Sequence, residues 1–220
     1  MFPIPVNIYF IIFSFLVSLF CYPSIKHRAL AWFIPFLLLM ISVELTGRYI
    51  RTGLHLANSW LYNIFIPVEY LFYTYLFYRY FEDKVFKKIA KTIMVLIPVA
   101  AVINIVFIQG FYSFNTNTLL AGNCIMICFC LLFFTDLFKR EEEMVLLTSP
   151  MFWITTGVLL FNLGELSYNL FFDYILKNRH DPKAMVFTAI NGKLVYVLYT
   201  MISIGLLCTK KWMARRYHPM

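Results

Sequence analysis

The chain has 220 residues, of which 61% are hydrophobic, 20% aromatic and 14% charged. An average soluble domain is about half apolar and about a quarter charged, so this composition excludes an ordinary soluble fold. The net charge of +8 does not indicate nucleic-acid binding, because the basic residues flank apolar runs and form no basic arm or aromatic-basic module.

Seven apolar segments follow one another along the chain, separated by short connections. Several reach the ~20 residues that cross a bilayer as a helix. The first segment lacks the positive start and the small-residue cleavage site of a signal peptide, so it is interpreted as a helix. The sequence therefore predicts an all-α, polytopic integral membrane protein, a seven-transmembrane-helix bundle in a single domain over residues 1–220. The predicted helices run over about 3–22, 29–47, 60–81, 90–109, 118–138, 150–174 and 185–209.

The distribution of Lys and Arg predicts the orientation of the bundle. Thirteen of the 19 basic residues fall on the side that holds the connections after the first, third and fifth helices and the C-terminal end. Five fall on the opposite side, and Lys193 lies inside the last helix. By the positive-inside rule, we expect the N-terminus outside and the C-terminus in the cytoplasm. The expected location is a bacterial cytoplasmic (inner) membrane.

Polar residues inside the second and third helices are the first candidates for a functional site. An ionisable side chain at membrane depth is costly and usually faces the interior of the bundle. Glu44 and Arg48 lie one turn apart on one face of the second helix. Glu69 and Tyr73 have the same spacing in the third helix.

The sixth and seventh helices carry the other candidates. Within the stretch NLGELSYNL, the spacing of Asn162, Glu165 and Asn169 places all three on one helix face. Lys193 lies in the seventh helix, whereas Asn191 is expected to point elsewhere, to a neighbouring helix. In the predicted orientation the ionisable positions of these four helices share the outer half of the bilayer. The sequence thus predicts an outward-facing polar pocket that contains Glu44, Arg48, Glu69, Tyr73, Asn162, Glu165, Asn169 and Lys193.

Two interpretations of these intramembrane charges stay open. They could form neutral pairs, such as Lys193 or Arg48 with a carboxylate, that fix the register of the helices. They could equally bind a ligand or an ion. Lys193 could also extend to the membrane surface. Elsewhere in the sixth helix, Gly157 and Gly164 share a face and favour close packing of a second helix.

Catalytic and metal-binding motifs are absent from the sequence. It contains no G-x-S-x-G, H-E-x-x-H, P-loop or Rossmann pattern, so an enzyme is not expected. The five cysteines lie in apolar segments without further ligands at zinc spacing, so no metal is expected. A retinal photoreceptor is a remote alternative that would use Lys193, but this lysine lies in the outer third of its helix. No cofactor is therefore expected.

Three segments carry a resemblance to a family: WLYNIFIPVEYLFYTYLF in the third helix, PMFWITTGVLLFNLGELSYNLF in the sixth and INGKLVYVLYTMISIGLLC in the seventh. They resemble the stand-alone or kinase-linked seven-helix sensor membrane regions of bacteria. The resemblance implies an extracellular-facing site coupled to the inner surface, and so a small sensor or ligand-binding module. The chain departs from this pattern because it lacks an output domain and because Lys193 stands where a polar uncharged residue is expected.

A small oligomeric transporter or channel is the second functional class. The expected partners are the lipid bilayer, further copies of the chain, and a cytoplasmic protein that contacts the loops 82–91 and 139–149. These loops hold the basic stretch EDKVFKK and the acidic residues Glu141 to Glu143. A solvated loop is the simpler interpretation of both.

Overall fold

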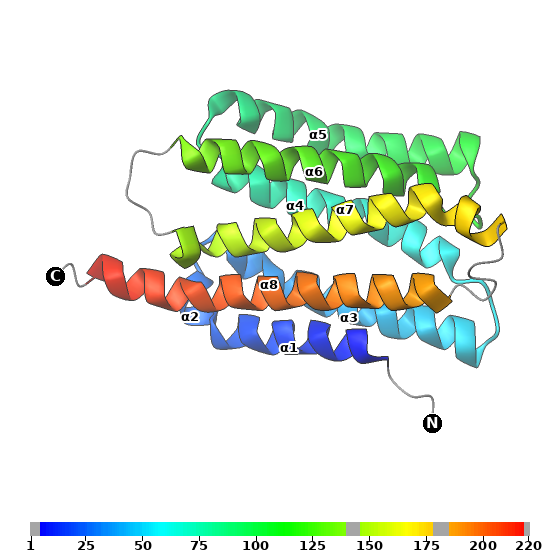
Figure 1. The fold of residues 1–220 in the computed structure, drawn as a ribbon, viewed down its shortest axis with the longest axis horizontal. Helices are drawn as coiled ribbons and strands as arrows, with labels where there is room; N and C mark the ends of the chain where they lie inside the picture. Colours follow the sequence, from blue (N-terminus) through cyan, green and yellow to red (C-terminus); the bar gives the residue numbers. More distant parts are fainter. Residues whose placement is uncertain (1–4, 140–145, 178–184, 218–220) are drawn as a thin grey trace. The chain divides into compact units, whose positions relative to one another are not determined.

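The computed structural model describes residues 5–139, 146–177 and 185–217, with side chains for residues 5–139, 146–170 and 190–210. Within these ranges all regular structure is helical, which confirms the predicted all-α fold (Figure 1). The α-helices are α1 (Val6–Phe20), α2 (Tyr22–Ile25), α3 (Phe33–Arg48), α4 (Ser59–Tyr80), α5 (Lys84–Ile103), α6 (Thr116–Phe138), α7 (Pro150–Lys177) and α8 (Met185–Tyr217). Short 3₁₀ turns form η1 (Ala29–Trp32) and η4 (Leu146–Thr148), and π-helical turns form η2 (Tyr49–Gly53) and η3 (Asn104–Ile108).

Four helical stretches in the described residues are long and apolar enough to cross a bilayer. They are Ala29–Gly53, Lys84–Ile108, Thr116–Phe138 and Ile190–Lys210. α1 is apolar but shorter. α4 and α7 occupy the predicted third and sixth positions and each carries asparagine and glutamate within the helix.

The start of α5 differs from the prediction. α5 begins at Lys84 rather than at residue 90, because Asp83 caps its first turn. The Asp83 Oδ1 atom accepts hydrogen bonds from the backbone N–H groups of Val85 (2.7 Å) and Phe86 (3.3 Å). The predicted loop 82–91 is therefore mainly helix.

The other predicted loop, 139–149, lies mostly outside the described residues, and so do Glu141 to Glu143.

The chain divides into two compact units. The first comprises Met1–Ile34 with Glu141–Met220, and the second comprises Pro35–Arg140. The single domain over residues 1–220 stays a prediction. Since each unit has its own packing, the two are described separately.

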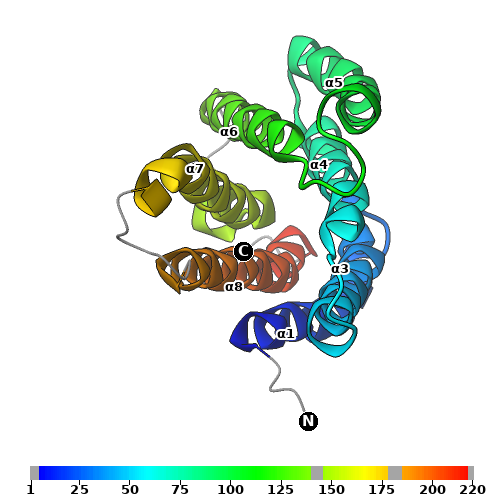
Figure 2. The same cartoon turned by 90° about the vertical axis from the view of Figure 1, so that its right-hand side faces the viewer.

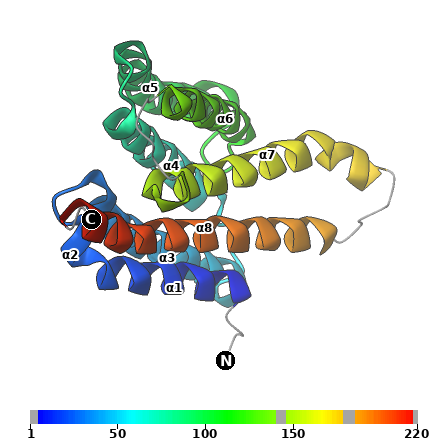
Figure 3. The same ribbon diagram turned by 60° about the vertical axis from the view of Figure 1, so that its left-hand side comes forward.

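In the first unit α8 packs against both α1 and α7, with α8 between them (Figures 1 and 3). The Ser14 hydroxyl on α1 donates to the backbone carbonyl of Tyr199 (2.8 Å) and lies 2.8 Å from the Ser203 hydroxyl on α8. On the opposite seam, a Cβ atom at Gly157 of α7 would lie 2.7 Å from the Cβ atom of Met201. Gly157 therefore permits the close approach of α8, which confirms the packing role predicted for it.

In the second unit α4 packs against α5 and α6 (Figure 2). The Tyr70 ring of α4 occupies the space that a side chain at Gly122 of α6 would need. The Tyr70 hydroxyl donates to the Leu119 carbonyl (2.9 Å) and to Asn123 Oδ1 (2.7 Å). Further along the same seam a buried aromatic cluster joins α4 to α6 and contains Phe77, Phe81, Phe129 and Phe133.

Candidate functional site

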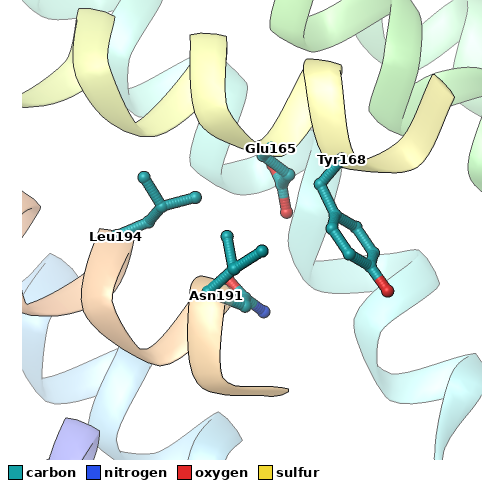
Figure 4. Close-up of a pocket in the computed structure, with 5 residues that line it drawn as sticks. Glu165, Tyr168, Asn191 and Leu194 are labelled. Carbon is teal, nitrogen blue, oxygen red and sulfur yellow. The ribbon is translucent and has the colours of Figure 1, made fainter. Parts of the chain in front are cut away.

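A small pocket lies between α7 and α8 in the first unit (Figure 4). Its lining residues are Glu165, Tyr168, Ile190, Asn191 and Leu194. The empty volume is about 160 Å³, a figure that includes open solvent. The part of this space that a water molecule could occupy is only about 10 Å³, which is room for about one water molecule or a small ion.

Helix periodicity positions the lining side chains. Glu165 and Tyr168 are three residues apart on α7, and both project toward α8 (Figure 4). Asn191 and Leu194 have the same spacing on α8 and face back toward α7. Gly164 of α7 packs directly on the Leu194 side chain, which holds the two helices close together beside the pocket.

Two of the lining residues, Glu165 and Asn191, carry side-chain oxygen atoms that can accept hydrogen bonds. The Oδ1 atom of Asn191 is buried and receives no hydrogen bond from the described residues. A buried acceptor without a donor costs about 1–3 kcal/mol, so a donor or a cation at this point is favourable. The Glu165 side chain lines the same pocket and adds a carboxylate. The arrangement therefore places a carboxylate and a buried amide oxygen on facing sides of α7 and α8.

The two predicted asparagines of α7 have a local role. The Asn162 side chain donates to the Val158 carbonyl one turn earlier (2.7 Å). The Asn169 side chain donates in the same way to the Glu165 carbonyl (2.8 Å). Both amides are thus paired with the backbone of their own helix, and neither residue lines the pocket. These bonds favour a structural role for the two residues.

Lys193 and Asn191 occupy different faces of α8, as the sequence predicts. Lys193 is exposed and does not line the pocket, whereas Asn191 does. Residues two positions apart on an α-helix point in directions about 200° apart around its axis, so only one of Asn191 and Lys193 can face α7. Asn191, rather than Lys193, lies opposite Glu165.

The remaining candidates belong to the second unit. Glu44 and Arg48 are partly buried on α3, Glu69 is partly buried on α4, and Tyr73 is buried there. The Tyr73 ring meets Phe36 edge to face, with 5.7 Å between the ring centroids. Because the α7 and α8 residues belong to the other unit, the meeting of the two sets in one pocket stays a prediction.

The sequence analysis missed a buried asparagine network in the second unit. Asn63 of α4 is fully buried, and its Nδ2 donates to the carbonyls of Phe111 (2.8 Å) and Ser113 (2.7 Å). Its Oδ1 accepts from the backbone N–H of Asn115 (2.8 Å). Asn104 of η3 donates to Gln109 Oε1 (2.7 Å) and to the Asn115 side chain.

This network fixes the connection between η3 and α6. Asn63 and Asn104 lie inside apolar segments, so the argument that selected the glutamates also applies to them. The Asn63 amide satisfies backbone groups of the connection, and the Asn104 amide bonds to side chains of the same connection, which indicates a structural role for both.

Four helices in the described residues have the length and the apolar composition that membrane-spanning helices have, which points to a helical membrane protein. Comparisons with protein-family models, with curated proteins and with solved structures give no match to the chain.

Proposed function

We propose that this chain is a multi-pass membrane protein of sensor type, which binds a small cation or protonated amine in the pocket between α7 and α8. The observation that supports the proposal most directly is the buried Asn191 Oδ1, which has no donor among the residues that the structure describes and lies opposite Glu165. A carboxylate and an amide oxygen are suitable partners for a monovalent cation or an ammonium group.

The proposal includes seven membrane crossings with the N-terminus outside, in a bacterial cytoplasmic membrane. In that orientation α7 runs outward and α8 runs inward. Glu165 follows Pro150 by 15 residues, which is about 22 Å along the helix at 1.5 Å per residue. Asn191 follows Met185 by six residues, or about 9 Å. Both positions fall in the outer half of a bilayer whose core is about 30 Å thick, so a ligand would enter from outside.

Binding is tested by thermal unfolding of the purified protein in lipid nanodiscs. The probes are Na⁺, K⁺, ammonium and methylammonium, added at constant ionic strength against the bulky cation N-methylglucamine. A ligand at one hundred times its Kd stabilises the native state by about 2.7 kcal/mol, which raises Tm measurably. We expect a small cation to raise Tm, and Glu165→Gln and Asn191→Leu each to abolish this rise.

Ser167→Ala is the matched control, because Ser167 is an exposed residue of α7 two positions from Glu165. It should keep the full response. The binding proposal fails if none of the small cations raises Tm above the N-methylglucamine value, or if Glu165→Gln responds like the parent protein. Uptake of the stabilising cation by proteoliposomes would instead assign the pocket to transport.

A further inference from the structure

Four lysines occupy one face of the first two turns of α5. Lys84, Lys87, Lys88 and Lys91 are spaced i, i+3, i+4 and i+7, so they form a single stripe along the helix. Lys84, Lys88 and Lys91 are exposed, and Lys87 is partly exposed. This lysine face lies in the second unit and has no part in the pocket of α7 and α8.

The placement of these lysines conflicts with the electrostatics of an isolated helix. The N-terminal end of a helix carries a partial positive charge, so cations in the first turns are unfavourable there. Like charges at i, i+3 and i+4 also repel one another. The carboxylate that begins the helix, Asp83, already accepts two backbone N–H bonds through Oδ1. An external anion would remove the conflict.

Neighbouring residues hold the lysine face in a fixed position. Asp136 of α6 is buried and accepts hydrogen bonds from the backbone N–H groups of Glu82 (2.8 Å) and Asp83 (3.3 Å). The Phe86 ring packs edge to face on Phe81, with 5.6 Å between the centroids. The start of α5 is therefore anchored on α6 and on the aromatic cluster. Because the helix is already ordered, binding of an anion to its lysines does not require the entropic cost of ordering it.

Beyond Lys91 the exposed side chains of α5 become apolar. Val95 is 64% exposed and Leu96 is 51% exposed, and Val99, Val102 and Ile103 continue the apolar surface. The stretch Lys84–Ile108 is long and apolar enough to cross a bilayer. If this apolar surface contacts the lipid tails, the lysine face lies at the level of the lipid headgroups.

We propose that the lysine face of α5 binds the phosphate headgroups of anionic phospholipids. The negatively charged lipid phosphates balance the positive charge of the helix end and of the four lysines. Each basic residue near an anionic membrane surface strengthens binding roughly fivefold, so two lysines together contribute roughly twenty-five-fold. The proposal is independent of the ligand of the α7 and α8 pocket.

The test measures Tm in nanodiscs of phosphatidylcholine alone and of phosphatidylcholine mixed with phosphatidylglycerol in equal parts. The variant is Lys88→Gln with Lys91→Gln. The parent protein should gain several degrees in the anionic discs, and the variant should lose most of that gain. In phosphatidylcholine alone the variant should unfold at the same temperature or higher, because the repulsion between lysines is reduced.

Two further variants make the result specific. Lys26→Gln with Arg79→Gln removes the same number of charges from exposed positions outside α5 and should keep the gain. Lys88→Arg with Lys91→Arg retains the charges and should also keep it. If the Lys26 and Arg79 variant loses as much of the Tm gain as the Lys88 and Lys91 variant does, the gain depends only on the net charge of the protein. That result would overturn the proposal.

The source of the phosphate is tested with inorganic phosphate added to phosphatidylcholine discs. A small effect is expected, since free phosphate is not concentrated at the membrane surface. Stabilisation equal to that by phosphatidylglycerol would assign the face to a soluble anion and overturn the lipid proposal. Equal Tm values of the parent protein in both kinds of disc would overturn it as well.

Discussion

Asparagines inside apolar helices of this chain differ in what their amides contact. Asn162 donates to a carbonyl of its own helix, whereas Asn63 joins α4 to a distant connection through three hydrogen bonds. Asn191 leaves its Oδ1 buried and facing a pocket. One residue type thus serves helix stability, tertiary structure and the candidate site, and only the partner of each amide distinguishes them.

Replacement of Asn63 and Asn162 by leucine should have very different effects. Asn63→Leu removes three hydrogen bonds and leaves the carbonyls of Phe111 and Ser113 and the buried N–H of Asn115 without this partner. We expect a loss of about 2–4 kcal/mol of unfolding free energy. Asn162→Leu removes one bond within its own helix and should cost less than about 1 kcal/mol. Thermal unfolding of both variants in one detergent checks this order, and equal losses would contradict it.

At the residue scale the sequence selected Glu165 as a candidate, whereas Asn191, which lines the same pocket, was not among the candidates. Helix periodicity places Asn191 and Lys193 on different faces, yet it does not say which face meets α7. That choice depends on how α8 is rotated when it packs on Gly157 and Gly164, which is a tertiary property. Selection by charge favours Lys193 over the neutral Asn191 two positions earlier.

In the second unit, α5 and α6 each begin at a capping side chain. Asp83 begins α5, and Asn115 begins α6 by accepting from the Thr118 N–H (3.3 Å). The predicted start of α5 at residue 90 was too late, because a boundary chosen by hydrophobicity leaves out the first helical turns, which contain lysines. The N-cap pattern of Asp83 was the signal that would have corrected it.

Removal of the cap on α5 should weaken the second unit in a graded way. Asp83→Ala leaves the N–H groups of Val85 and Phe86 without their acceptor, and we expect it to cost about 1 kcal/mol. Asp83→Ser keeps an oxygen at the cap and should cost a few tenths of a kcal/mol. Thermal melts followed by circular dichroism compare the two. A serine variant as unstable as the alanine variant would show that the cap bonds do not hold this helix.

At the scale of the whole molecule, the predicted orientation can be tested with single cysteines in a variant without the five native thiols. Ser113→Cys lies in the connection before α6, which is predicted outside, and Lys26→Cys lies in a predicted cytoplasmic connection. Both positions are exposed. A membrane-impermeant maleimide should label Ser113→Cys in intact cells and Lys26→Cys only after lysis. The reverse pattern would invert the topology.

The helices themselves were predictable because ~20-residue apolar runs have few other uses. The division into two units was not, since it depends on contacts between distant segments. α1 packs on α8, although nearly the whole sequence separates them, and no local sequence pattern predicts this contact.

This pairing of the first helix with the last has a consequence for biosynthesis. Residues 35–140 of the second unit are continuous, so the ribosome completes them before it synthesises α8, the helix on which α1 packs. The Ser14 hydroxyl bonds to a residue 185 positions later. At about 5–20 residues per second, translation takes roughly ten to forty seconds to cover that distance. During this interval the nascent chain carries the Ser14 hydroxyl without its native acceptor, and the first unit assembles only after the second unit has been synthesised.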